Sequence, residues 1–217
     1  MKKIKFVLFI AFLPAFLFSA PKKSNSNDLI FQVEDDSTNK KTSNSSGAFG
    51  LNMGMTLSEI KNACNKVSPK QIEGDKYYVY PIKTHPLFKY YIAYVDDSQG
   101  LYCLQAVSDK IETNEYGVEI KEAFAEIKDR VSKTYGTPKM IDTIDPKSWW
   151  QNDSYWLLGI SEGARTYSAI WDSQLKDDVS RVSIKVYGNS VWKYGTITLE
   201  YDFSNKAIVE DYQDDVF

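Results

Sequence analysis

The sequence predicts an α+β domain in which two main helices pack on one face of an antiparallel sheet. Two observations lead to this fold class. Segments of alternating apolar and polar residues outnumber the helical ones, as in sheets with one buried and one wet face. Parallel strands would each need a crossover connection, and too few helical segments are present to supply them. The order helix, strands, helix, strands also allows a diverged duplication.

The first twenty residues have the layout of a secretory signal peptide. Three lysines precede an apolar run from Phe6 to Phe18, and the small residues Ser19 and Ala20 close it. This run is shorter than the roughly twenty residues that span a bilayer. We therefore expect residues 1–20 to be removed, the protein to be exported to the periplasm or the extracellular space, and no transmembrane segment to remain after cleavage.

A polar segment follows the predicted signal. Residues 21–47 are dominated by Ser, Asn, Lys, Asp and Thr. Such a composition buries too little apolar surface to offset the entropy of ordering, so we expect a disordered leader or tether. Its apolar exception, 29–33, is a docking motif, a short strand added to the edge of the domain, or a few stray apolar residues. The folded α+β domain is expected over 48–217.

The domain is expected to open with a helix and a set of strands. Thr56 and Glu59 have the spacing of a capping box, so a helix should begin at Leu57 and end before Pro69. Strands are predicted over 77–82, 90–95 and 101–107. Turn-forming residues between the last two predict a hairpin.

The second helix has the clearest pattern in the chain. Ile120, Phe124, Ile127 and Val131 recur at spacings of four, three and four, and charged residues cover the opposite side. Gly136, followed closely by a proline, should end the helix. Further strands are predicted over 155–160, 166–171, 182–187 and 196–203, and a short helix over 205–212.

Two short stretches resemble a known type of exported domain. In 49–61, an apolar entry leads through Gly54-Met55-Thr56 into a helix, and 135–138 reads Tyr-Gly-Thr-Pro at a helix end. Both are similar to the β-lactamase-inhibitor-like fold, which includes the small lipoprotein of the outer-membrane barrel-assembly machine. The resemblance implies a non-catalytic binding or assembly role at the cell envelope. The lipid-anchor cysteine of that lipoprotein is missing here, and no functional residues carry over.

The chain has two cysteines, Cys64 and Cys103. An exported protein can keep a disulfide, and a bridge between them would close a loop of about forty residues, with a stabilisation on the order of 4 kcal/mol. The alternative is two buried free thiols that pack as small hydrophobic groups. The spacing leaves both open.

Motifs for catalysis or metal binding are weak. Residues 159–163 fit G-x-S-x-G, but this elbow needs a strand before Ser161 and a helix after it, whereas a strand is predicted on both sides. The single histidine, His85, stands in a loop without an identifiable partner. Paired aspartates do not match a calcium loop and are explained by turns. We therefore name no catalytic, cofactor-binding or metal residues and expect no cofactor.

The five tryptophans are the remaining candidates for recognition. They all fall in the second half of the chain: Trp149, Trp150, Trp156, Trp171 and Trp192. Most should fill the core, although exposed rings could bind a sugar or a peptide. Trp149 and Trp150 are the best candidates for binding aromatics, because neighbours on a strand point to opposite faces.

Charge restricts the class of partner. The formal net charge is −3, and removal of the signal takes away three lysines, which disfavours nucleic acid as a partner. The sequence thus favours an exported, non-enzymatic protein that binds a protein or peptide at the cell envelope. The alternative is a carbohydrate-active or other hydrolase with carboxylates in an aromatic-lined cleft.

Overall fold

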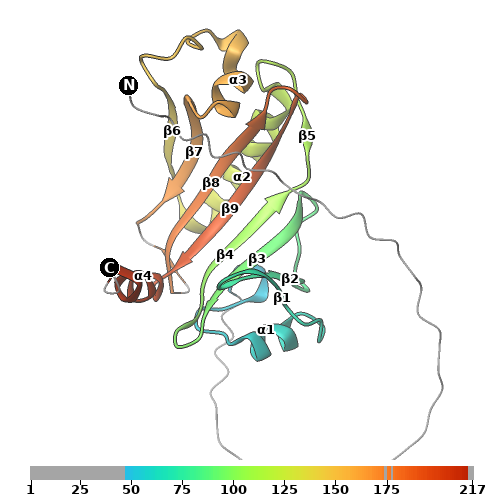
Figure 1. Cartoon of the computed structure of the whole chain (residues 1–217), viewed down its shortest axis with the longest axis vertical. Coiled ribbons are helices and arrows are strands. Elements are labelled where there is room, and N and C mark those ends of the chain that lie inside the picture. The colour runs from blue at the N-terminus through green and yellow to red at the C-terminus, as the bar shows by residue number, and fades with distance from the viewer. Residues whose placement is uncertain (1–46, 174, 177, 215–217) are drawn as a thin grey trace, which may run out of the picture. The chain divides into compact units, whose positions relative to one another are not determined.

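Nine strands form one antiparallel sheet in the part of the chain that the structure describes (Figure 1). The structure is a computed structural model, and it describes residues 47–173, 175–176 and 178–214. The predicted signal peptide over 1–20 and the predicted tether, apart from its last residue, lie outside the described residues. Those two expectations therefore stay predictions.

The two halves of the chain meet in the middle of the sheet. The strand order is β1-β2-β3-β4-β9-β8-β7-β6, and β5 pairs with β9 beside this path. The strands are β1 (Lys70–Glu73), β2 (Lys76–Val79), β3 (Phe88–Asp96), β4 (Gly100–Ser108), β5 (Ile111–Glu112), β6 (Lys139–Ile144), β7 (Arg165–Trp171), β8 (Val179–Asn189) and β9 (Tyr194–Phe203). The pairing of β4 with β9, in which Cys103 is opposite Asp202, joins segments about one hundred residues apart.

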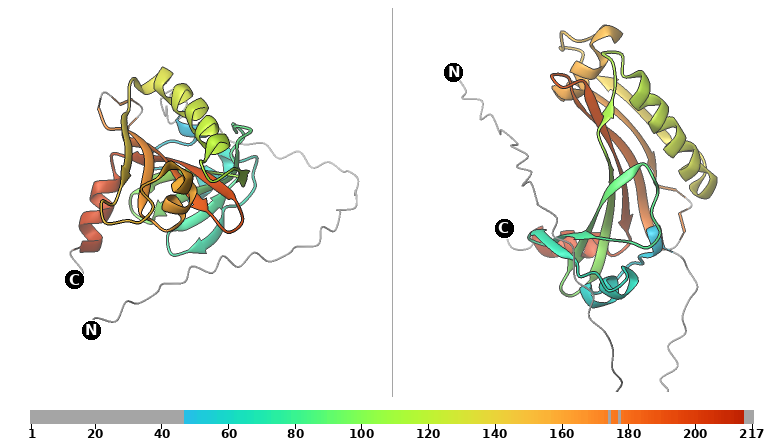
Figure 2. Two further views of the ribbon diagram at one scale, coloured as in Figure 1. Left: turned by 90° about the horizontal axis from the view of Figure 1, so that it is seen from above. Right: turned by 90° about the vertical axis from the view of Figure 1, so that its right-hand side faces the viewer.

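Helix α2 (Val118–Tyr135) covers one face of the sheet. Its apolar stripe, Ile120, Phe124, Ile127 and Val131, is buried against β5, β8 and β9, as the spacing predicted. Burial of each large apolar side chain stabilises the fold by about 1.5–3 kcal/mol. Figure 2 shows α2 on one side of the sheet and α4 (Lys206–Asp214) on the other.

Helix α1 (Leu57–Ala63) begins as predicted and ends earlier. The capping box is present, because Glu59 N–H donates to Thr56 Oγ1 at 3.3 Å and Thr56 N–H donates to Glu59 Oε2 at 2.9 Å. Asn65 and Lys66 adopt positive φ angles of 52° and 62°. This left-handed turn ends the helix before the predicted stop at Pro69.

The prediction of a strand over 155–160 is wrong. A 3₁₀ turn, η2 (Asp153–Tyr155), leads into a short helix, α3 (Trp156–Ser161). Asn152 caps the turn, since its Oδ1 accepts a hydrogen bond from Ser154 N–H at 2.9 Å. A short apolar run does not distinguish a buried strand from a buried helix, and here the cap decides for the helix.

The architecture confirms the α+β class. The strands predicted around the central hairpin and in the last third of the chain are present. The short helix predicted over 205–212 is present as α4. A packing of two main helices on one face, and a duplication, stay predictions. Among the described helices, none is long and apolar enough to cross a membrane.

Candidate binding site at one end of the sheet

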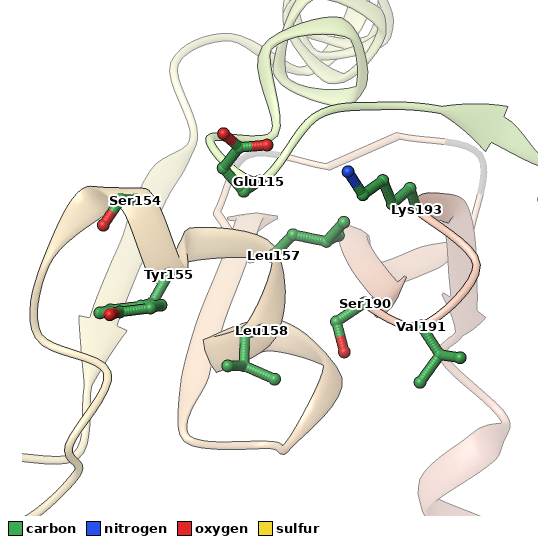
Figure 3. Close-up of a pocket in the computed structure, with 8 residues that line it drawn as sticks. All are labelled: Glu115, Ser154, Tyr155, Leu157, Leu158, Ser190, Val191 and Lys193. Carbon is green, nitrogen blue, oxygen red and sulfur yellow. The ribbon is translucent and has the colours of Figure 1, made fainter.

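An apolar pocket of about 430 Å³ opens at the end of the sheet where α3 lies (Figures 1 and 3). Three connecting segments supply its walls: α3 with the turn before it, the β8–β9 turn, and the loop between β5 and α2. The lining residues are Glu115, Ser154, Tyr155, Leu157, Leu158, Ser190, Val191 and Lys193. Its volume falls in the range of about 300–1,000 Å³ that is usual for ligand pockets.

Hydrogen bonds between the three segments fix the pocket walls. Leu157 N–H donates to the carbonyl of Glu115 at 3.0 Å, which joins α3 to the loop before α2. Ser190 N–H donates to Ser161 Oγ at 3.3 Å, which joins the β8–β9 turn to the end of α3. The walls are therefore held in fixed positions, because α3 is hydrogen-bonded both to the β5–α2 loop and to the β8–β9 turn.

Trp156 is the first residue of α3 and directly precedes the pocket residue Leu157. Its ring is buried, and Lys121 Nζ lies 4.4 Å from the ring centroid while donating to the carbonyl of Tyr116 at 2.8 Å. The ring lies directly against Gly117, where a Cβ atom would come within 2.2 Å of it. Gly117 also has a φ of 71°, so the position requires glycine on both counts.

Large apolar side chains stand exposed around the pocket. Val191 and Trp192 are 80% and 74% exposed, and Tyr155 is exposed as well. Asn189 Oδ1 accepts a hydrogen bond from Trp192 N–H at 3.0 Å, which fixes the turn that carries them. Exposed apolar groups that gather beside a pocket are typical of interaction sites.

A more polar cavity of about 600 Å³ adjoins the apolar pocket. Glu115 and Lys193 line both spaces, and Trp192 lines the polar one. The polar cavity also has the carboxylates of Glu112 and Glu119. The end of the sheet thus carries an apolar space and an acidic space side by side.

Glu119 is held in its charged form. Its Oε2 accepts hydrogen bonds from Thr113 Oγ1 at 2.8 Å and from Asn114 N–H at 3.1 Å. Its own backbone N–H, together with these two donors, holds the pKa of Glu119 below its usual range. The carboxylate is therefore ionised at neutral pH.

The tryptophans predicted for binding are near this site and do not line it. Trp149 is 90% exposed and Trp150 is half-buried, in the connection between β6 and η2 rather than on a strand. The Trp150 ring packs on Tyr155 with centroids 5.5 Å apart, and Tyr155 lines the pocket. The sequence gives Trp192 no binding role. In the structure its ring is exposed and lines the polar cavity beside the pocket.

A third cavity, of about 170 Å³, is lined by residues of α4 and of the strands β3, β4 and β9, and α4 lies on the other side of the sheet from α2 (Figure 2). In the described part of the chain, Cys103, Glu200 and Asp202 form the one group with donor atoms close enough to hold a metal, within 4.8 Å of one another. The ammonium group of Lys206 already lies there, 2.6 Å from Asp202 Oδ1 and 3.8 Å from Glu200 Oε1. The chain thus supplies its own cation.

Burial dominates the electrostatics of this polar cluster. It raises the pKa of the Glu200 carboxyl, against the hydrogen bond from Gln105, and raises the pKa of the Cys103 thiol. It also raises the pKa of Tyr94 to about 12. The thiol therefore stays protonated at neutral pH, and a nucleophilic role for Cys103 is disfavoured.

The two cysteines are free in this structure, and both are buried. Cys64 packs in the main hydrophobic core, whereas Cys103 belongs to a small separate cluster with Tyr102 and Val209. Of the two arrangements that the sequence left open, the structure has the pair of buried thiols.

The residues of the G-x-S-x-G motif have a structural role. Ser161 is the last residue of α3, and its Oγ accepts the hydrogen bonds that hold the β8–β9 turn. The Nδ1 of His85 accepts from Leu87 N–H at 3.3 Å, and its ring contacts Phe88. Ser161 ends a helix and β7 follows it, so the strand predicted before Ser161 is absent and the order is the reverse of the strand and helix of a nucleophile elbow.

Most residues of the pocket were missed from the sequence. The sequence predicts a strand that includes Leu157 and Leu158, and it suggests no role for Val191. One signal was present: the turn after β8 carries Val191 and Trp192 where a hairpin turn favours Gly, Asn or Asp.

Comparison with known proteins gives no relative on which to base a function. No family model matches the chain, and neither curated proteins nor solved structures gave a significant match. The functional argument therefore depends on the geometry of the site.

Proposed function

We propose that the protein is exported and binds a protein or peptide partner at the cell envelope, through the apolar pocket at the end of its sheet. The observation that carries the proposal is the exposure of Val191 and Trp192 beside a pocket with fixed walls. Leaving such side chains in water costs about 1.5–3 kcal/mol each relative to burial, so a partner that covers them gains that energy. The signal-like N-terminus supports export.

Two related parts of the hypothesis are kept as proposals. Residues 49–61 and 135–138 resemble β-lactamase-inhibitor-like domains. This resemblance implies a non-catalytic role and therefore supports binding. Mass spectrometry of the exported protein should show the loss of about twenty residues, as expected for a signal peptide. An intact N-terminus on the exported protein would contradict export through a cleaved signal.

The hydrolase alternative depends on the polar cluster. Glu200 lines a cavity together with Tyr94 and Tyr102, Asp202 lies close to it, and the pKa of Glu200 is raised by burial as for a general acid. The cavity, at about 170 Å³, is below the usual size of a ligand pocket. Lys206 also occupies the space between the carboxylates. Binding at the apolar pocket is therefore the better supported function.

Site-specific photo-crosslinking tests the proposal. A photoreactive amino acid at position 191, beside the pocket, should give discrete adducts in cells. The same group at position 126, on the exposed side of α2, should give few. Leu158→Ser replaces a large apolar side chain of the pocket lining by a small polar one, at a position outside the buried core. It should reduce the adducts at position 191 several-fold. Equal adducts at both positions, or adducts that are unchanged by Leu158→Ser, would contradict binding at this pocket.

A further inference from the structure

The apolar pocket and the polar cavity beside it share two lining residues, Glu115 and Lys193. Both spaces are lined by residues of the β5–α2 loop and of the β8–β9 turn, which a hydrogen bond from Thr113 N–H to the carbonyl of Lys193 joins at 3.0 Å. A single extended ligand can therefore place one side chain in each space. Alternate side chains of an extended peptide point to the same side, so the two occupying residues would be two positions apart.

The polar cavity has the charge of a cation-binding site. Three carboxylates, those of Glu112, Glu115 and Glu119, line it together with one ammonium group, that of Lys193. The nearby Lys121 is directed to the carbonyl of Tyr116 and to the Trp156 ring, as described above. The local excess of negative charge therefore favours a positively charged ligand group.

Trp192 adds a second recognition element for a cation. Its ring lines the polar cavity and is largely exposed. Lysine and arginine bind to the faces of such rings, with about 0.5–1 kcal/mol at exposed sites. Carboxylates and an indole face together suit a guanidinium or ammonium group better than they suit any neutral or acidic group.

From this arrangement we infer that the double pocket recognises an extended segment of a partner protein in which a bulky apolar residue stands two positions from a lysine or an arginine. The apolar side chain fills the pocket between Tyr155, Leu158 and Val191. The cationic side chain enters the space lined by Trp192 and the glutamates. The inference rests on the proposed function and specifies the chemistry of its partner.

Four capped heptapeptides test the selectivity of the full-length protein by NMR titration at low salt. Two carry phenylalanine and arginine in both orders, Gly-Ser-Phe-Ser-Arg-Ser-Gly and Gly-Ser-Arg-Ser-Phe-Ser-Gly. The controls replace arginine by glutamate, or phenylalanine by alanine, in the first of these. We expect one arginine peptide to shift the amide signals of 112–119 and 190–193 and to bind at least tenfold more tightly than both controls.

Charge variants show whether the glutamates cause this preference. Glu112→Gln combined with Glu115→Gln should reduce the preference for arginine over glutamate to threefold or less. Both side chains are exposed, so the fold should be kept, and unchanged spectra elsewhere would confirm it. Glu126→Gln, on the exposed side of α2, is the matched control and should leave the preference intact.

Several outcomes would overturn the inference. The first is that the glutamate peptide binds as tightly as, or more tightly than, both peptides that carry phenylalanine and arginine. The second is that the shifted amide signals all lie in other parts of the domain. The third is that neither phenylalanine–arginine peptide binds up to millimolar concentration. Crosslinking at position 191 judges the proposed function separately. Site-dependent adducts together with a lack of arginine preference would reject the ligand chemistry and keep the binding function.

Discussion

The polar cluster beside α4 and the site around the apolar pocket differ in whether their side chains are paired within the chain. In the polar cluster, Lys206 is paired with Asp202 and Glu200, and α4 covers the group. At the other site, Val191 and Trp192 are turned to solvent although the walls behind them are fixed. The side chains of the polar cluster are thus paired within the chain, whereas the apolar side chains of the turn are held in place and left uncovered.

The strand pattern explains why the polar cluster needs its own cation. Leu199 and Tyr201 of β9 face the core, so the alternate residues Glu200 and Asp202 point to the opposite face. Their carboxylates would repel each other in a partly buried space. Lys206 follows Asp202 by four residues at the start of α4 and provides the compensating charge.

The largest expected effect is the loss of this cation. Lys206→Met removes the cation between Asp202 and Glu200, although Glu200 keeps its hydrogen bond from Gln105, and it should lower the free energy of unfolding by about 3 kcal/mol at neutral pH. Urea denaturation followed by circular dichroism measures the change. Lys185→Met, an exposed lysine of β8, is the matched control, with an expected change within about 0.5 kcal/mol.

A loss at Lys206 no larger than at Lys185 would break the comparison. The polar cluster would then not depend on its own cation, and the space between the carboxylates would be available to a ligand or a metal. Tighter binding of a divalent cation by Lys206→Met than by the wild type would instead support the comparison, because the added cation would take the place that Lys206 leaves.

A somewhat smaller loss is expected at the start of α2, two residues after the pocket residue Glu115. Gly117→Ala places a methyl group within 2.2 Å of the Trp156 ring and forces alanine to a φ of 71°. The overlap and the backbone strain together should cost about 2–3 kcal/mol. Thermal unfolding measures it, and Gly163→Ala, which shares a positive φ and has open space, separates the backbone strain from the overlap. Equal losses in the two variants would mean that the Trp156 contact is unimportant.

Local patterns predicted the fold well where one strong signal acted alone. The capping box at Thr56 and the stripe of Ile120 and Phe124 are both present as expected. The edge strands β1 and β6 were missed, because their mixed, largely exposed residues give little alternation.

The candidate site could be predicted only in part. It is assembled from 112–119, 153–161 and 189–193, and the pairing of distant strands decides that these segments meet. Single residues of the site, such as Trp192, were visible as aromatics. That they surround a pocket follows from tertiary contacts, which one sequence without relatives does not reveal.

A change in pH should affect the polar cluster and leave the apolar pocket unaffected. The pKa of Glu200 is raised on folding by burial, so its contribution to stability is present below the pKa of an unfolded glutamate, about 4.3, and is lost as pH rises through the folded value. The wild type should therefore lose stability relative to Glu200→Gln as the pH increases from about 4 to neutral. Denaturation curves of both proteins across this interval measure the difference. A difference that is constant with pH, or that changes in the opposite direction, would contradict the raised pKa.

The smallest effect on stability is expected for Trp192→Ser. This prediction distinguishes most sharply between the polar cluster, which is expected to stabilise the fold, and the site around the apolar pocket, which is proposed to bind a partner. The side chain is exposed, so the free energy of unfolding should change by less than about 0.5 kcal/mol. Binding should respond far more, because exposed aromatic anchors at interfaces can cost 2 kcal/mol or more when they are truncated. The adducts at position 191 and the affinity for the arginine peptides measure binding, and urea denaturation measures stability. A variant that loses stability as Lys206→Met does, or that keeps full binding, would show that Trp192 belongs to the fold rather than to a site for a partner.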